Sequence, residues 1–147
     1  MNARSVRPTA ACLALVIAGM LAIGVGADVW RWFAVQMIPA ALAVLLVARN
    51  EPVGVYGAPA IFVYWLMMLA LIVFWLFTNG AQHDVWYFAL AGIVVAVSIV
   101  CVAGIVVALR AAAGGNRWRR GFALAAFAAF QVGAWFLSSP FFEATGA

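Results

Sequence analysis

The chain has 147 residues, of which 69% are hydrophobic and 8% are charged. Soluble domains contain about 45–50% apolar and about 25% charged residues, so this composition excludes an ordinary soluble domain and predicts a membrane protein. The net charge of +4 arises from arginine, because the sequence contains no lysine. The arginines stand at the ends of apolar runs, where membrane topology accounts for them, so we expect no binding to nucleic acid.

Five apolar runs are long enough to cross a membrane as helices. A helix needs about 20 predominantly apolar residues to cross the hydrocarbon core, and the polar residues between these runs are too few for a soluble domain. We therefore predict an all-α fold, a polytopic helical bundle that forms one transmembrane domain over residues 1–147. The five predicted transmembrane helices are residues 9–27, 30–48, 59–77, 85–109 and 121–138.

Prolines and glycines predict where these helices bend or end. Residues 49–59 contain two prolines and two glycines and are expected to form a loop between the second and third spans. Pro39 lies inside the second span, where it removes a backbone donor and frees the carbonyl of Val35. We expect the second helix to kink there, with the neighbouring Gln36 helping to satisfy the freed backbone. The fifth span is expected to end near Pro140.

The distribution of arginines predicts the orientation of the bundle. Seven arginines face the cytoplasm when the amino terminus is inside, and the opposite orientation reverses this split. The positive-inside rule therefore predicts a cytoplasmic amino terminus and an external carboxy terminus. The seven are Arg4, Arg7, Arg49, Arg110, Arg117, Arg119 and Arg120, whereas Arg31 lies outside.

The first span has an alternative interpretation as a cleaved signal peptide. It has a basic start and an apolar middle, and Val25-Gly26-Ala27 resembles a small-residue cleavage site before Asp28. Its apolar run is at the upper edge for a signal peptide and adequate for a transmembrane helix. Cleavage would leave four transmembrane helices in the same orientation.

Small residues recur at four-residue spacing in three of the predicted spans. Because lipid is as apolar as leucine, close packing of small residues favours helix association in a membrane. We therefore expect the first, fourth and fifth spans to pack together, with the bulky third span more exposed to lipid. Replacing Ala129 and Gly133 with leucine should then destabilise the fold. The small residues are Ala10, Ala14, Ala18, Ala22 and Gly26 in the first span, Gly92, Ala96, Gly104 and Ala108 in the fourth, and Gly121, Ala125, Ala129 and Gly133 in the fifth.

Two embedded glutamines form the first candidate site. No Asp, Glu, Lys or Arg lies well inside any predicted span, which disfavours proton-coupled transport through the midplane. Gln36 and Gln131 lie at similar depths, so a hydrogen bond between them across the bundle is possible. They act either as structural glue between helices or in recognition of a lipid headgroup, a quinone carbonyl or a partner helix.

Polar residues of the outer loops form a second candidate site. Asp28, Arg31, His83 and Asp84 are all expected at the outer end of the bundle. A metal site needs three or four ligands, and one histidine with carboxylates from separate loops gives thin support for one, so no metal site is predicted. A single histidine also excludes bis-histidine haem, and no cofactor is predicted.

A cluster of basic residues lies between the fourth and fifth spans. Topology alone explains these residues, but they also fit a site for an anionic lipid headgroup or for a partner. The cluster consists of Arg110, Arg117, Trp118, Arg119 and Arg120.

The sequence carries no nucleophile motif, P-loop, dinucleotide fingerprint or H-E-x-x-H motif, so we do not expect an enzyme. The first hypothesis is a non-enzymatic accessory or scaffold subunit that packs against other membrane helices, or against a second copy of itself, in the lipid bilayer. The alternative is a small transporter, or a lipid- or quinone-binding membrane protein, that uses polar residues in the outer half. The alanine- and arginine-rich composition without lysine suggests the inner membrane of a bacterium.

Overall fold

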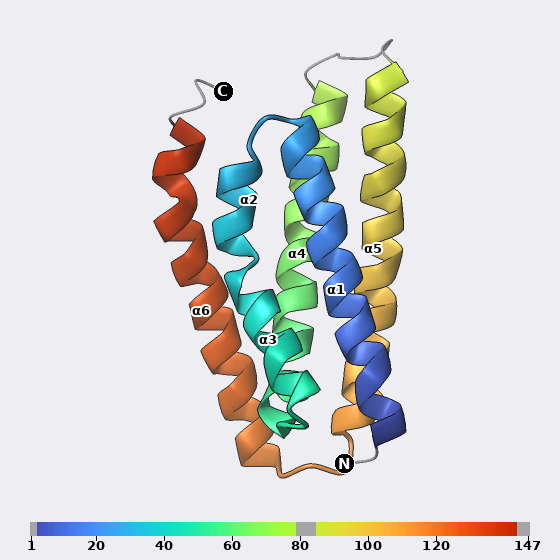
Figure 1. Ribbon diagram of the computed structural model, residues 1–147, viewed down its shortest axis with the longest axis vertical. Helices are drawn as coiled ribbons and strands as arrows, with labels where there is room; N and C mark the ends of the chain where they lie inside the picture. The colour runs from blue at the N-terminus through green and yellow to red at the C-terminus, as the bar shows by residue number, and fades with distance from the viewer. Residues whose placement is uncertain (1–2, 79–84, 144–147) are drawn as a thin grey trace.

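The computed structural model describes residues 3–78 and 85–143, which form helices joined by short turns and contain no strand (Figure 1). The elements are α1 (Ala3–Gly26), α2 (Trp30–Gln36), α3 (Ile38–Ala48), α4 (Pro52–Thr78), α5 (Val85–Ala112) and α6 (Arg117–Glu143). Four of these, α1, α4, α5 and α6, are long and apolar enough to cross a membrane. A fifth span results if the bent pair α2 and α3 is counted as one. The prediction of an all-α bundle is confirmed at this level.

Figure 1 shows that α1 begins and α6 ends at opposite ends of the bundle. The start of α1, the turn from α3 to α4 and the turn from α5 to α6 lie together at one end. Arg31, in the first turn of α2, lies at the other end. We call the first of these the arginine end, because its helix ends and turns contain Arg7, Arg49, Arg110, Arg117, Arg119 and Arg120.

The helices are longer than the predicted spans, and two predicted boundaries are wrong. The predicted loop at residues 49–59 is confined to residues 49–51, because α4 begins at Pro52 and continues through Pro59. The glycines there serve helix packing: a Cβ on Gly54 would lie 2.8 Å from the carbonyl oxygen of Ala43 in α3. At the other end of the chain, α6 continues through Pro140 to Glu143 instead of ending near the proline.

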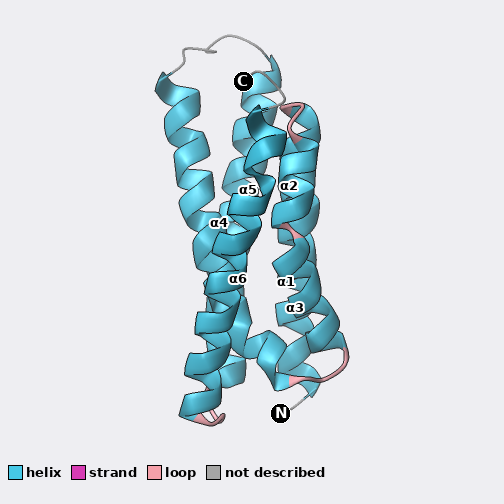
Figure 2. Ribbon diagram, turned by 90° about the vertical axis from the view of Figure 1, so that its left-hand side faces the viewer, coloured by secondary structure: helices cyan, strands magenta, loops and turns pink. Residues whose placement is uncertain are grey.

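The predicted kink at Pro39 is confirmed. The helix breaks at Met37 and bends by 43° between α2 and α3, with Pro39 in the first turn of α3. Figure 2 shows this break as a loop partway along the bundle. The bend lets the two halves have different neighbours, since α2 packs against α6 and α1 whereas α3 packs against α4 and α1.

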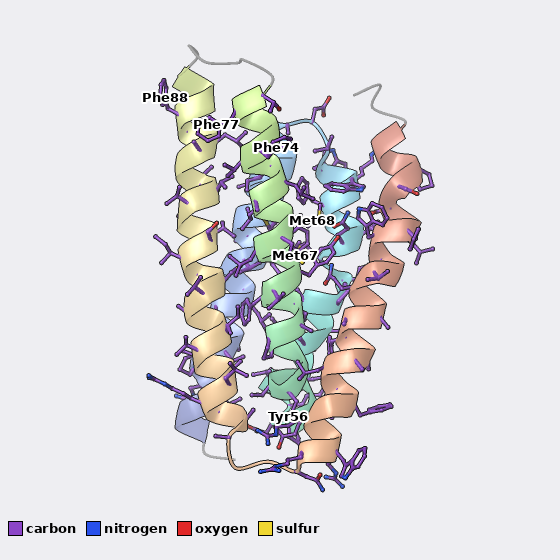
Figure 3. The ribbon with its side chains drawn as sticks, turned by 180° about the vertical axis from the view of Figure 1, so that it is seen from behind. Tyr56, Met67, Met68, Phe74, Phe77 and Phe88 are labelled. Atoms are coloured by element: carbon purple, nitrogen blue, oxygen red, sulfur yellow. The ribbon has the colours of Figure 1, made fainter. Side chains whose placement is uncertain are left out.

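The third predicted span, α4, packs mainly against three other helices and keeps one exposed face, which carries Phe74. Figure 3 shows it between α5 and α6, and it also packs against α3. Trp65 is 0% exposed and stacks on Phe33 of α2 with ring centroids 6.0 Å apart. The ring of Phe62 is likewise buried and lies directly over Gly104 of α5. The expectation that this span is more lipid-exposed than the others is therefore wrong for Phe62 and Trp65, although Phe74 is exposed. A glycine on α5 gives the Phe62 ring the space it needs inside the bundle.

The small-residue stripes of α1 and α6 do not lie inside the bundle. α1 packs against α5 as expected, but its buried face is formed by Leu13, Val16 and Met20. α6 packs mainly against α4 and α2, and the stripe residues Ala125 and Ala129 are exposed. The prediction that the first, fourth and fifth spans pack together is correct only for α1 and α5. Four-residue spacing identifies one face of a helix but not whether another helix covers that face.

Candidate functional site

Four polar side chains from α2, α4 and α6 meet inside the bundle, and we call them the amide cluster: Gln36, Tyr64, Gln131 and Ser138. Gln36 is the last residue of α2, beside the bend, and is 0% exposed. Its Nε2 donates to Oγ of Ser138 at 3.1 Å, and its Oε1 accepts from the hydroxyl of Tyr64 at 2.8 Å. The Ser138 hydroxyl in turn donates to the carbonyl oxygen of Trp135 at 2.8 Å.

The two glutamines are hydrogen-bonded to each other, as their similar depth permits. Nε2 of Gln131 donates to the backbone carbonyl oxygen of Gln36 at 3.0 Å. This bond corrects one prediction: the side chain that satisfies backbone at the bend comes from α6, and the Gln36 side chain bonds elsewhere. The carbonyl of Val35 accepts from a backbone N–H at the end of α2. The break at Met37 interrupts the backbone hydrogen bonds between α2 and α3, and the amide from α6 donates to the Gln36 carbonyl at this break.

One oxygen of the amide cluster has no partner. Gln131 is 1% exposed, and its Oε1 is a buried atom without a hydrogen bond among the described residues. Exchanging the amide nitrogen and oxygen would not help, since the oxygen would then face the Gln36 carbonyl, which also only accepts. The orientation is therefore determined by Gln36, and Oε1 remains able to accept a hydrogen bond from water, a hydroxyl or an amide.

Sequence reasoning identified two members of the amide cluster and missed the others. Tyr64 was not a candidate, although a tyrosine in the middle of an apolar span needs a hydroxyl partner, and this signal was available. Ser138 is placed by α6, one residue before Ser139, whose hydroxyl bonds within its own helix to Phe136 at 2.8 Å. Nothing in the spacing of these residues distinguishes the serine that points inward from its neighbour.

Two of the four residues of the second candidate site, Asp28 and Arg31, are among the residues that the structure describes. Asp28 is exposed in the turn between α1 and α2, where it has a left-handed φ of 57°. The guanidinium of Arg31 lies over the ring of Trp30, 5.4 Å from its centroid. Neither side chain belongs to the amide cluster. His83 and Asp84 lie outside the described residues.

The basic cluster lies on an ordered turn between α5 and α6, at the arginine end. Nη1 of Arg120 donates to the carbonyl oxygen of Ala112 at 3.3 Å, which joins the first turn of α6 to the last turn of α5. Oδ1 of Asn116 accepts from the backbone N–H of Trp118 at 2.9 Å and caps α6. Gly115 packs against the Tyr56 side chain of α4. Within the basic cluster, Arg120 is half-buried and the other members, Arg110, Arg117, Trp118 and Arg119, are exposed.

Replacing Gln131 with leucine is expected to lower the free energy of unfolding by about 1 kcal/mol, the usual size of an interhelical hydrogen bond in a membrane. The substitution leaves the Gln36 carbonyl without its donor, but it also removes the unpartnered Oε1. Unfolding in mixed detergent micelles measures the change, with Val132→Leu on the exposed side of the same turn as the control. Equal stability of the two variants would show that the amide bond contributes nothing.

The amide cluster and the basic cluster are separate candidate sites, one inside the bundle and one at its arginine end. The amide cluster contains uncharged groups that donate or accept hydrogen bonds, whereas the basic cluster presents positive charge. No protein-family model, curated protein or solved structure matches this chain significantly.

Proposed function

We propose that this chain is a non-enzymatic membrane subunit that packs against the transmembrane helices of a partner, as an accessory or scaffold component. The proposal rests on the small residues that α6 exposes on the surface of the bundle. Gly121, Ala125 and Ala129 are exposed, and Gly133 is half-buried. We call these four residues the α6 small face.

The α6 small face has the composition of a helix–helix contact, but no helix of the described residues covers it. A Cβ built on Gly121 or Gly133 would meet nothing within 4 Å. Inside the bundle, by contrast, Gly57 and Gly104 are each covered by an aromatic ring of a neighbouring helix. Small residues allow helix backbones to approach closely, whereas lipid contact gives them no advantage over leucine. A partner helix on this face would make use of them.

The hydrogen bonds inside the bundle favour this proposal over a transport function. Gln36, Tyr64 and Ser138 bond to one another across three helices, so these polar groups are already used to hold the bundle together. Such bonds are the ordinary role of uncharged polar side chains between membrane helices.

The remaining proposals concern location and orientation. We place the chain in the inner membrane of a bacterium, with the arginine end in the cytoplasm. The basis is the positive-inside rule, because six arginines gather at one end of the described bundle and Arg31 lies at the other.

Leucine on the α6 small face is expected to release the partner while leaving the fold intact. The double variant Ala125→Leu/Ala129→Leu adds bulk where the chain itself has open surface, so its thermal unfolding should match that of the unmodified protein. Affinity purification from native membranes in mild detergent, followed by mass spectrometry, should then recover much less of a stoichiometric membrane partner.

The matched control is Ala96→Leu/Ala103→Leu on the exposed side of α5, which should retain the partner. The proposal fails if the chain purifies without any stoichiometric membrane partner or further copy. It also fails if both double variants release the partner equally, since the contact would then not be specific to α6.

A second candidate function is binding of a small molecule at the amide cluster. It is favoured by the unpartnered Oε1 of Gln131 beside a broken helix, because broken helices form binding sites in many transporters. Since Oε1 only accepts, the ligand would present a donor, such as a quinol or a lipid hydroxyl. A ligand extracted from the purified protein and lost in Gln131→Leu would support this function over the first.

A further inference from the structure

Positive charge is concentrated without compensation on the turn between α5 and α6. Residues 110–120 contain four arginines and no acidic residue. Arg110, Arg117 and Arg119 are exposed, and Arg120 is half-buried with one bond to backbone. At the arginine end the described acidic residue is Glu51, in the turn between α3 and α4. The charge on the α5–α6 turn is therefore available to an anion.

The backbone of this turn is held by hydrogen bonds and packing. The Arg120–Ala112 hydrogen bond joins the two helix ends, the Trp118–Asn116 bond caps α6, and Gly115 packs against Tyr56. Figure 3 shows the turn crossing the end of α4 near Tyr56. Arginine is well suited to phosphate, because its planar guanidinium offers two parallel donors to two phosphate oxygens.

An apolar surface extends along α4 from Val63, about two turns beyond Tyr56, toward the opposite end of the bundle. α4 lies between α5 and α6, and exposed side chains recur along it at helical spacing: Val63, Met67, Leu71 and Phe74. At the start of α6, Trp118 is 88% exposed and Phe122 is also exposed, as is typical of aromatic residues at the level of lipid headgroups. A molecule with an anionic head and long apolar chains matches both surfaces at once.

We propose that the α5–α6 turn binds an anionic phospholipid, with the phosphate between Arg110 and Arg117 and the acyl chains along the exposed face of α4. Charge complementarity favours this occupant over a zwitterionic lipid, whose choline group would oppose the arginines. The apolar face of α4 favours it over a soluble acidic peptide, which has no acyl chains to place there. The site is independent of the partner contact proposed for α6.

Native mass spectrometry of the purified protein, titrated with phosphatidylglycerol or with phosphatidylcholine of the same acyl chains, tests the site. We expect phosphatidylglycerol to be retained preferentially. The double variant Arg110→Gln/Arg117→Gln should weaken that retention about tenfold, since each basic residue near an anionic headgroup contributes appreciably to binding. The matched control, Arg7→Gln/Arg49→Gln, removes the same charge from the same end and should bind as the unmodified protein does.

Three results would overturn the proposal. Equal retention of the two lipids would show that no anionic site exists. Equal loss in both double variants would show diffuse attraction to the arginine end. Release of a bound membrane protein by Arg110→Gln/Arg117→Gln, without an effect on lipid, would make the turn a protein interface. If that double variant does not fold, Arg117→Gln alone provides the comparison.

Discussion

Replacing Trp65 with alanine is expected to lower the free energy of unfolding by about 3–5 kcal/mol, the range for deleting a large buried aromatic side chain. Trp65 is completely buried at the centre of the bundle, in contact with Phe33 and Tyr64. In a membrane the loss is one of packing, because the cavity removes dispersion contacts that lipid does not restore. Unfolding in mixed detergent micelles measures the difference.

The matched control for Trp65→Ala is Phe74→Ala on the same helix. Phe74 is 67% exposed, so its removal should change the free energy of unfolding by less than about 1 kcal/mol. Similar losses at the two positions would contradict the burial of Trp65 among neighbouring helices. That result would favour the expectation from sequence, in which this helix is more exposed to lipid.

Replacing Gly54 with alanine is expected to cost about 1–3 kcal/mol, the range for overpacking a well-packed interior. The added Cβ would lie 2.8 Å from the carbonyl oxygen of Ala43 and 2.9 Å from the backbone nitrogen of Val47. Backbone atoms of α3 cannot rotate away as a side chain can, so the two helices must separate. Unfolding of the purified variant measures this cost.

The control for Gly54→Ala is Gly121→Ala, where a Cβ would meet nothing within 4 Å. Alanine has the higher helix propensity, so this variant should be unchanged or slightly more stable. If the control loses as much stability as Gly54→Ala, the loss would come from replacing any helical glycine with alanine. The close approach of α3 and α4 would then not explain it.

Several features of the fold followed from the sequence because their causes are local. Apolar runs of sufficient length predict membrane-spanning helices wherever they occur, and these helices are present, with the number of spans depending on how the bent pair is counted. Pro39 removes a backbone donor in any surroundings, so the bend at α2 and α3 was predictable. The two glutamines lie at similar depths along their own helices, and this alone allowed them to meet.

Other features depended on which helices are neighbours, and spacing along one helix cannot show that. Glycines at 54 and 57 favour turns when considered alone, yet both lie inside α4 against other helices. The stripes on α1 and α6 appeared suited to packing inside the chain, and the structure leaves much of them exposed. Tyr64 and Ser138 became part of a site only because α4 and α6 bring them to Gln36.

The sequence by itself determined the class of the protein, the position of its helices and the end of the bundle at which its arginines gather. The tertiary structure decided that α4 buries Trp65 against other helices, that Gln131 serves the backbone of Gln36 and that the α6 small face is open. The physical reason is that lipid and protein interior are similarly apolar. Hydrophobicity therefore does not indicate which face of a membrane helix is buried, and shape complementarity between helices decides it.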